Sequence, residues 1–318
     1  MPRLRTTLIA SLAVLCAPAL FAADMQNTQP ASSAVPGTLN YVEGTVLVDG
    51  QPVTQKSVGS VTLLPGQEIS TENGRAEVLL TPGVFFRIGD NSEAKMVSPE
   101  LTNTVVELDR GRAAIEVDQI YKENNLHVIE NQIPVQLVKT GFYEFDASNN
   151  SMMVFKGEAA ALRPNEKFVA IKSGHELNLS DTATLKTVKF NTKAQEPSGL
   201  YRWSSLRSDY LSRANQQIAA NYGEGYAPGW YRDPYMIGYT FIGPSPFYSP
   251  FGWGFYPLGW AGAYGWGYPG WGYPGWGFGG GYYGGTRWVG PHGPLNLQRG
   301  GFGPNVGTHG GHVGGHGR

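Results

Sequence analysis

The last 97 residues of this chain are too poor in aliphatic side chains to build an ordinary hydrophobic core. Residues 222–318 hold 31 of the 44 glycines, seven of the eight tryptophans, 25 of the 39 aromatic residues and six charged side chains. A pentapeptide, Trp-Gly-Tyr-Pro-Gly, begins at Trp266 and again at Trp271, a period far shorter than that of a stacked repeat protein. Because glycine also loses the most backbone entropy on folding, we predict a disordered, adhesive tail over 222–318.

Residues 37–180 have the alternation of apolar and polar residues that is typical of β-strands. Ala76, Val78 and Leu80, for example, occupy every second position, and side chains two residues apart lie on the same face of a strand. Asn-Gly, Pro-Gly, Asp-Gly and Ser-Gly pairs separate such segments, and these pairs supply the backbone conformations of tight turns. The pattern predicts an all-β domain of the sandwich, barrel or solenoid kind.

A linker over 181–197 precedes one predicted amphipathic helix over 198–221. Its apolar residues recur at spacings of three and four, with charged residues between them, as on one face of a helix. The members of this stripe that would contact a partner are Leu200, Trp203, Leu206 and Tyr210. Two uses of the stripe stay open, because packing on the β domain and binding a partner both require an apolar face.

The first residues resemble a secretory signal peptide. Over residues 1–23, Arg3 and Arg5 precede a short apolar run and then small residues, which is the order of a cleaved export signal. A polar leader over 24–36 follows. We therefore expect a periplasmic or extracellular, cell-surface protein with no membrane-spanning segment after cleavage. The single cysteine, Cys16, would leave with the signal peptide, so the mature chain would have no thiol.

Composition and motifs argue against catalysis and nucleic-acid binding. The formal net charge is −1, whereas nucleic-acid binding needs a basic surface. The sequence has no Gly-x-Ser-x-Gly and no His-Glu-x-x-His, and its glycine-rich stretches lack the Lys-Ser/Thr of a phosphate loop. We predict a non-enzymatic protein with no cofactor.

The tail offers two kinds of candidate contact. Exposed aromatic rings stack on sugars or on one another, so the tail could hold cell-wall polysaccharide, self-associate or have no ligand at all; the tryptophans concerned are Trp253, Trp260, Trp266, Trp271 and Trp276. Three histidines at the C-terminus, His309, His312 and His316, are spaced to bind a divalent transition metal. Incidental histidines in a glycine-rich segment are the alternative.

The β region resembles the FecR domain family, which is named for a periplasmic transducer of bacterial iron–siderophore signalling. Three stretches, Leu63–Val97, Val105–Val117 and Leu126–Phe145, are similar to successive blocks of that family. Residues 139–141 (Lys-Thr-Gly) depart from its usual Gly-Thr pair. The resemblance covers about 37–180 and implies a stacked β-solenoid or sandwich that acts as an extracytoplasmic interaction module.

The resemblance leaves three hypotheses for function. In the first, the β domain docks an envelope protein or cell-wall component and the tail adheres. In the second, the domain senses a ligand and reports through a separate membrane protein. The family's transducer carries a cytoplasmic anti-sigma segment and a membrane helix, whereas here we expect a signal peptide and a leader in that place. The third hypothesis, a carbohydrate-active enzyme, has the least support, because no motif favours it.

Overall fold

The structure, a computed structural model, describes residues 34–163, 168–180, 185–196, 198–221, 227–233 and 238–260. The predicted signal peptide, most of the predicted leader and the tail from residue 261 onward lie outside these ranges. Within the described ranges, no helix combines the length and the apolar character that crossing a membrane requires.

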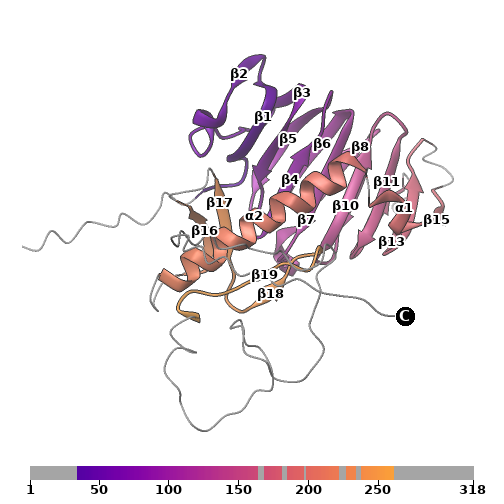
Figure 1. The fold of residues 1–318 in the computed structure, drawn as a ribbon. Helices are drawn as coiled ribbons and strands as arrows, with labels where there is room; N and C mark the ends of the chain where they lie inside the picture. Colours follow the sequence, from indigo (N-terminus) through magenta and orange to yellow (C-terminus); the bar gives the residue numbers. More distant parts are fainter. Residues whose placement is uncertain are drawn as a thin grey trace, which may run out of the picture. The chain divides into compact units, whose positions relative to one another are not determined.

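The β region forms one 15-stranded sheet, which confirms the predicted all-β class (Figure 1). Its strands are β1 (Leu39–Val48), β2 (Gln51–Val53), β3 (Glu68–Leu79), β4 (Val84–Ile88), β5 (Glu93–Glu100), β6 (Asn103–Arg110), β7 (Arg112–Val117), β8 (His127–Glu130), β9 (Ile133–Leu137), β10 (Gly141–Asp146), β11 (Ser151–Lys156), β12 (Glu158–Leu162), β13 (Phe168–Lys172), β14 (His175–Asn178) and β15 (Thr187–Lys189). Short 3₁₀ turns lie at Gln55–Ser57 and Lys122–Asn124. Neighbouring strands are antiparallel except β6 and β8, which are parallel.

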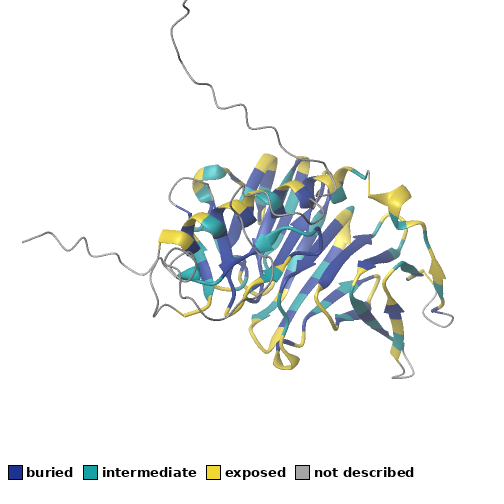
Figure 2. Ribbon diagram, turned by 60° about the horizontal axis from the view of Figure 1, so that its bottom comes forward, coloured by how far each residue is buried: buried dark blue, intermediate teal, exposed yellow. Residues whose placement is uncertain are grey.

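The sheet folds over at β3 and almost closes on itself. The first residues of β3, Glu68–Ser70, pair with β5, whereas its last residues, Ala76–Leu79, pair with β4. From there the strand order runs through β5, β6, β8, β9 and β12 to β13 on one side, and through β4, β7, β10, β11 and β14 to β15 on the other. Both halves contribute to one core, which includes Met96, Val106 and Val128 from the first and Phe86, Ile115 and Phe145 from the second. Buried residues run along the strands and exposed ones gather at the hairpin ends (Figure 2).

The predicted helix exists with nearly the predicted bounds. Helix α2 (Gly199–Asn221) lies across the outer face of the β4–β7–β10 half of the sheet, and a short helix α1 (Thr192–Gln195) precedes it (Figure 1). Ser198 caps α2, because its side-chain oxygen accepts a hydrogen bond from the Tyr201 backbone N–H at 3.2 Å. The helix therefore packs on its own β domain, which was one of the two uses left open.

Part of the glycine- and aromatic-rich region, within residues 227–233 and 238–260, is folded. It contributes strands β16 (Gly229–Arg232), β17 (Tyr239–Ile242), β18 (Phe247–Tyr248) and β19 (Gly254–Phe255). Their buried aromatic side chains form a second cluster with residues of the sheet and of α2; its members are Leu79, Phe85, Leu211, Trp230, Tyr239, Phe241 and Phe255. The structure thus corrects the predicted boundary, because rings supply the buried area that aliphatic side chains usually provide.

Candidate functional site

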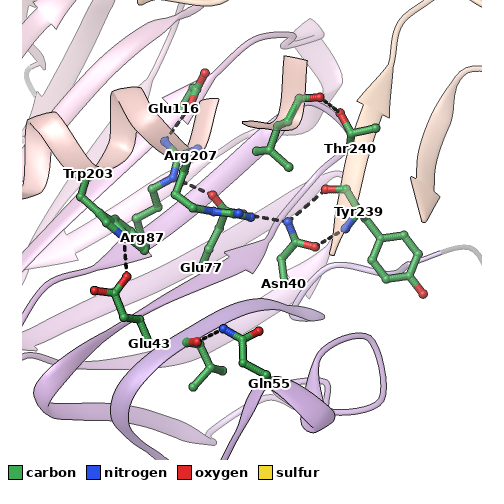
Figure 3. Close-up of polar contacts among 12 residues, drawn as sticks. Asn40, Glu43, Gln55, Glu77, Arg87, Glu116, Trp203, Arg207, Tyr239 and Thr240 are labelled. Carbon is green, nitrogen blue, oxygen red and sulfur yellow. Dashed lines mark hydrogen bonds and ion pairs between the residues drawn. The ribbon is translucent and has the colours of Figure 1, made fainter. Parts of the chain in front are cut away.

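A fully buried ion-pair network lies between the sheet and α2. Glu77, Arg87 and Glu116 come from the adjacent strands β3, β4 and β7, and each is 0% exposed. The Arg87 guanidinium donates from Nε to Glu77 at 2.7 Å and from Nη1 to Glu116 at 2.6 Å (Figure 3). One arginine therefore bridges two carboxylates on the face of the sheet that α2 covers.

Helix α2 supplies a matching polar group to each of these carboxylates. Arg207 donates from Nη2 to Glu77 at 2.7 Å, and Ser208 donates from Oγ to Glu116 at 2.6 Å. The Arg207 guanidinium also lies 4.1 Å from the centre of the Tyr41 ring, a distance at which a cation is attracted to the ring face. The helix is thus positioned by charge and hydrogen bonding as well as by apolar packing.

Asn40 and Asn215 connect the C-terminal strands to the same core. Asn40 donates to Glu77 at 2.8 Å and to the Tyr239 carbonyl at 3.0 Å, and it accepts from the Tyr239 N–H at 2.6 Å (Figure 3). On α2, Asn215 donates to the Phe241 carbonyl at 2.9 Å and accepts from the Tyr256 N–H at 2.7 Å. Sheet, helix and aromatic strands are therefore held in one polar framework.

Burial and the neighbouring charges shift the pKa values of the acids in this network in different directions. Burial alone would raise the pKa of Glu77, but the charges of Arg207 and Arg87 lower it to about 2. Burial raises the pKa of Glu116, and the Arg87 charge and the Ser208 hydroxyl oppose that rise. Burial and the neighbouring Glu116 charge raise the pKa of Asp118 well above its ordinary value. Arg207 and Arg87 therefore favour the ionised form of Glu77, whereas burial favours the protonated form of Glu116 and of Asp118.

This network has the character of a structural device rather than a reaction centre. Its four ionisable members hold one another, and none of them lines either of two cavities found among the described residues. The larger cavity, about 250 Å³, is lined by β-sheet residues and Tyr248, Ser249 and Pro250. The smaller, about 130 Å³, lies among the rings of Phe142, Phe155, Tyr201 and Phe251.

A separate buried acid gives the protein a distinctive pH dependence. Glu130, at the end of β8, is 0% exposed, and burial, together with the charge of Asp146, raises its pKa to about 8 from an ordinary value of 4.5. The unfolded chain releases this proton near pH 4.5, whereas the folded chain keeps it to about pH 8. The contribution of Glu130 to stability is therefore complete below pH 4.5 and is lost as the pH rises to 8.

Glu130→Gln should remove this loss. We expect the variant to match the parent near pH 4.5 and to exceed its free energy of unfolding by about 4–5 kcal/mol at pH 8, as measured by urea denaturation. Glu144→Gln is the matched control, because burial raises the pKa of Glu144 to about 7 and its effect should be complete near that pH. Parallel pH profiles for Glu130→Gln and the parent would contradict the assignment.

The predicted partner stripe of α2 divides between two faces. Leu200 and Trp203 are buried against the sheet, whereas Leu206 is 49% exposed and Tyr210 is 41% exposed. Half of the buried residues of α2 are polar, and these are Ser204, Ser205, Arg207, Ser208, Ser212 and Asn215. The apolar stripe therefore includes the contact residues Leu200 and Trp203, but it does not reveal the polar residues that are buried beside them.

The structure places two of the five predicted tail tryptophans. Trp253 is partly buried, and its indole N–H donates to the Ser205 carbonyl of α2 at 3.1 Å. Trp260 stacks on Tyr256 with the ring centroids 4.1 Å apart. Trp253 thus packs within the protein instead of standing free for a ligand. The remaining candidates, Trp266, Trp271, Trp276, His309, His312 and His316, lie outside the described residues.

The sheet ends in two edge strands, β13 and β15. Within the described residues, β13 pairs with β12 alone and β15 pairs with β14 alone, so each has one edge without a strand partner in that part of the chain. Both carry an exposed apolar side chain: Phe168 on β13 is 61% exposed and Val188 on β15 is 54% exposed. Unpaired strand edges are templates for pairing with another chain.

Within the described residues, no group of three histidine, cysteine or acidic side chains could hold a metal ion.

Comparison with known proteins gives few and distant similarities. No protein-family model matches the chain, and no curated protein matches it. Two crystal structures, each described as a proposed anti-sigma factor from Parabacteroides distasonis, are similar with a TM-score of 0.34. The first structure is 17% identical, and the similarity covers 44% of this chain and 64% of the other chain, just under two thirds of its length. The second is 14% identical, and the similarity covers 56% of this chain and 99% of the other chain. These values are compatible with a FecR-like domain at most and carry no functional argument.

Proposed function

We propose that this chain is a non-enzymatic, exported binding module of the cell envelope that docks a partner protein through the open end of its sheet. The observation that carries the proposal is the pair of unpaired edges, β13 and β15, each with an exposed apolar side chain. Main-chain hydrogen bonding at such an edge gives affinity, and adjacent side chains give specificity.

The enclosed polar network supports a binding role over a catalytic one. Glu77, Arg87 and Glu116 are 0% exposed, and Arg207 is 5% exposed, so these charges have no access to a substrate. Their mutual contacts use the strongest hydrogen-bonding groups of the domain to fix α2 in place. A rigid scaffold of this kind holds the sheet edges in a constant position for a partner.

Export and an adhesive tail belong to the same proposal. The sequence order of a signal peptide supports a periplasmic or cell-surface location, and the Trp-Gly-Tyr-Pro-Gly repeats support adhesion to polysaccharide or to other copies of the tail. The regulatory alternative, a ligand sensor that reports through a membrane protein, is loosely compatible with the two anti-sigma neighbours.

Sedimentation with purified envelope fragments tests the docking proposal. The mature protein should pellet with the fragments, and Phe168→Asp/Val188→Asp should abolish pelleting by placing charges at the two edges. Leu64→Asp/Leu101→Asp is the matched control, because Leu64 is 58% and Leu101 is 51% exposed elsewhere on the domain; it should pellet normally.

A chain that ends at Trp260 separates the edges from the tail. It should still pellet if the sheet edges dock the partner. Loss of pelleting in this truncated chain, with normal pelleting of Phe168→Asp/Val188→Asp, would overturn the docking proposal and assign binding to the tail.

A further inference from the structure

The β15 edge presents a backbone that is ready to accept another strand. The Phe190 N–H donates to the Gly174 carbonyl at 3.0 Å, and the register pairs Val188 with Glu176. Because successive residues of an antiparallel strand point their backbone groups to opposite sides, Phe190 and Val188 face β14. The backbone N–H and C=O of Thr187 and Lys189 therefore face away from the sheet.

Exposed lysine side chains lie around this edge. Lys186 and Lys189 flank Val188, Lys193 lies on the following helix α1, and all three are exposed. Among the described residues, no ion pair involves them. Among the described residues, the acids beside this edge are Glu176 on β14 and Glu196 after α1. Three lysines against these two acids leave a local positive charge in the described part of the edge, beside the outward backbone groups.

We infer that the β15 edge binds an extended, acidic segment of the partner protein, which adds to the sheet as one further strand. This inference rests on the proposed docking function and names the chemistry of its partner. Cross-strand neighbours of opposite charge stabilise pairing, whereas like charges oppose it, so the acidic residues of the added strand would lie beside Lys189 on one face of β15. On the opposite face, its β-branched residues would cover the exposed Val188 side chain.

Lysines on an edge strand also serve to block unwanted pairing, and the test has to separate the two roles. An edge that is only protected carries charge without exposed apolar side chains, whereas Val188 here is 54% exposed. A docking edge loses affinity when its outward N–H is removed. A purely protected edge self-associates when its charge is removed.

Fluorescence anisotropy with two labelled synthetic peptides tests the inference on the full mature chain. Both peptides have eight residues that alternate valine or threonine with a charged residue, which is aspartate or glutamate in one and lysine in the other. We expect the acidic peptide to bind at least tenfold more tightly than the basic one, with an affinity that falls as salt is added.

Two variants locate the bound strand. Thr187→Pro removes an outward N–H, which an edge strand tolerates, and should weaken acidic-peptide binding about tenfold, as loss of a backbone hydrogen bond would. Lys186→Glu/Lys189→Glu should weaken it further and favour the basic peptide. Lys56→Glu/Lys122→Glu, at exposed lysines elsewhere, should leave binding unchanged. Unchanged thermal unfolding of Thr187→Pro confirms that the strand itself stays in place.

Equal binding of both peptides, or full binding by Thr187→Pro, would overturn the inference. Self-association of Lys186→Gln/Lys189→Gln, which removes both charges, with unaltered peptide binding would assign the lysines to edge protection and overturn the inference equally. If envelope fragments still pellet the parent chain but not Phe168→Asp/Val188→Asp, while the acidic peptide fails to bind, the inference falls and the docking function stands.

Discussion

Arg87→Met should lower the free energy of unfolding by about 3–5 kcal/mol. The Arg87 guanidinium bonds Glu77 and Glu116 at 2.7 and 2.6 Å, and all three side chains are 0% exposed. Methionine fills much of the same volume but leaves Glu116 with no guanidinium partner and Glu77 with Arg207 alone. A buried carboxylate without its counter-charge either stays ionised at high cost or takes up a proton.

Urea denaturation at neutral pH measures this loss, and an exposed arginine provides the control. Arg110 pairs with Glu93 at 3.3 Å, and its side chain is 60% exposed. Arg110→Met should therefore cost less than about 1 kcal/mol. Similar losses for Arg87→Met and Arg110→Met would show that the enclosed network does not hold the domain together.

Truncation after Asn221 should destabilise the domain by about 5 kcal/mol or more. This truncation removes Trp230, Phe241 and Phe255, whose side chains are between 0% and 6% exposed, and burial of each contributes about 1.5–3 kcal/mol. It also strips the hydrogen-bond partners of Asn215 on α2.

Truncation after Trp260 is the matched control, because it keeps all four C-terminal strands. Its thermal unfolding temperature should equal that of the full mature chain. The chain that ends at Asn221 should unfold at least 10 °C lower, a shift that corresponds to a few kcal/mol in a domain of this size. Equal unfolding temperatures for the two truncated chains would mean that residues 227–260 do not belong to the folded unit.

Much of the fold was predictable because its signals are local. The alternation of Ala76, Val78 and Leu80 predicted a strand; the structure shows β3 ending at Leu79, and all three side chains belong to the core. Spacings of three and four predicted α2 to within one residue at its start. The alternation within one strand does not specify which other strand it pairs with. The change of pairing partner along β3 and the parallel pairing of β6 with β8 could therefore not be predicted from the sequence.

The buried polar network could not be predicted, because its residues occur in the sequence at positions where exposed polar residues are expected. Glu77 and Arg87 alternate with apolar residues, as solvent-facing positions of a strand do. Arg207 and Ser208 are polar positions of a helix whose exposed face carries Leu206 and Tyr210. Only the contact between α2 and the sheet turns these positions inward, and that contact is long-range in the chain.

The aromatic strands were missed for a related reason. Composition predicted that residues after Asn221 could not collapse, since aliphatic side chains are scarce there. Trp230 and Phe241 instead pack on Phe85 and Leu211 of the preceding domain. A segment without a core of its own can still fold when another element supplies half of the buried surface.

Hydrogen exchange of the full mature chain, with and without purified envelope fragments, tests the docking claim most directly. The account predicts at least tenfold slower exchange on binding at the backbone amides of 168–172 and 185–190, the two edges of the sheet. It predicts unchanged exchange in α2 and in β16–β19. Slower exchange confined to the exposed face of α2, around Leu206 and Tyr210, or no change at either sheet edge, would contradict it.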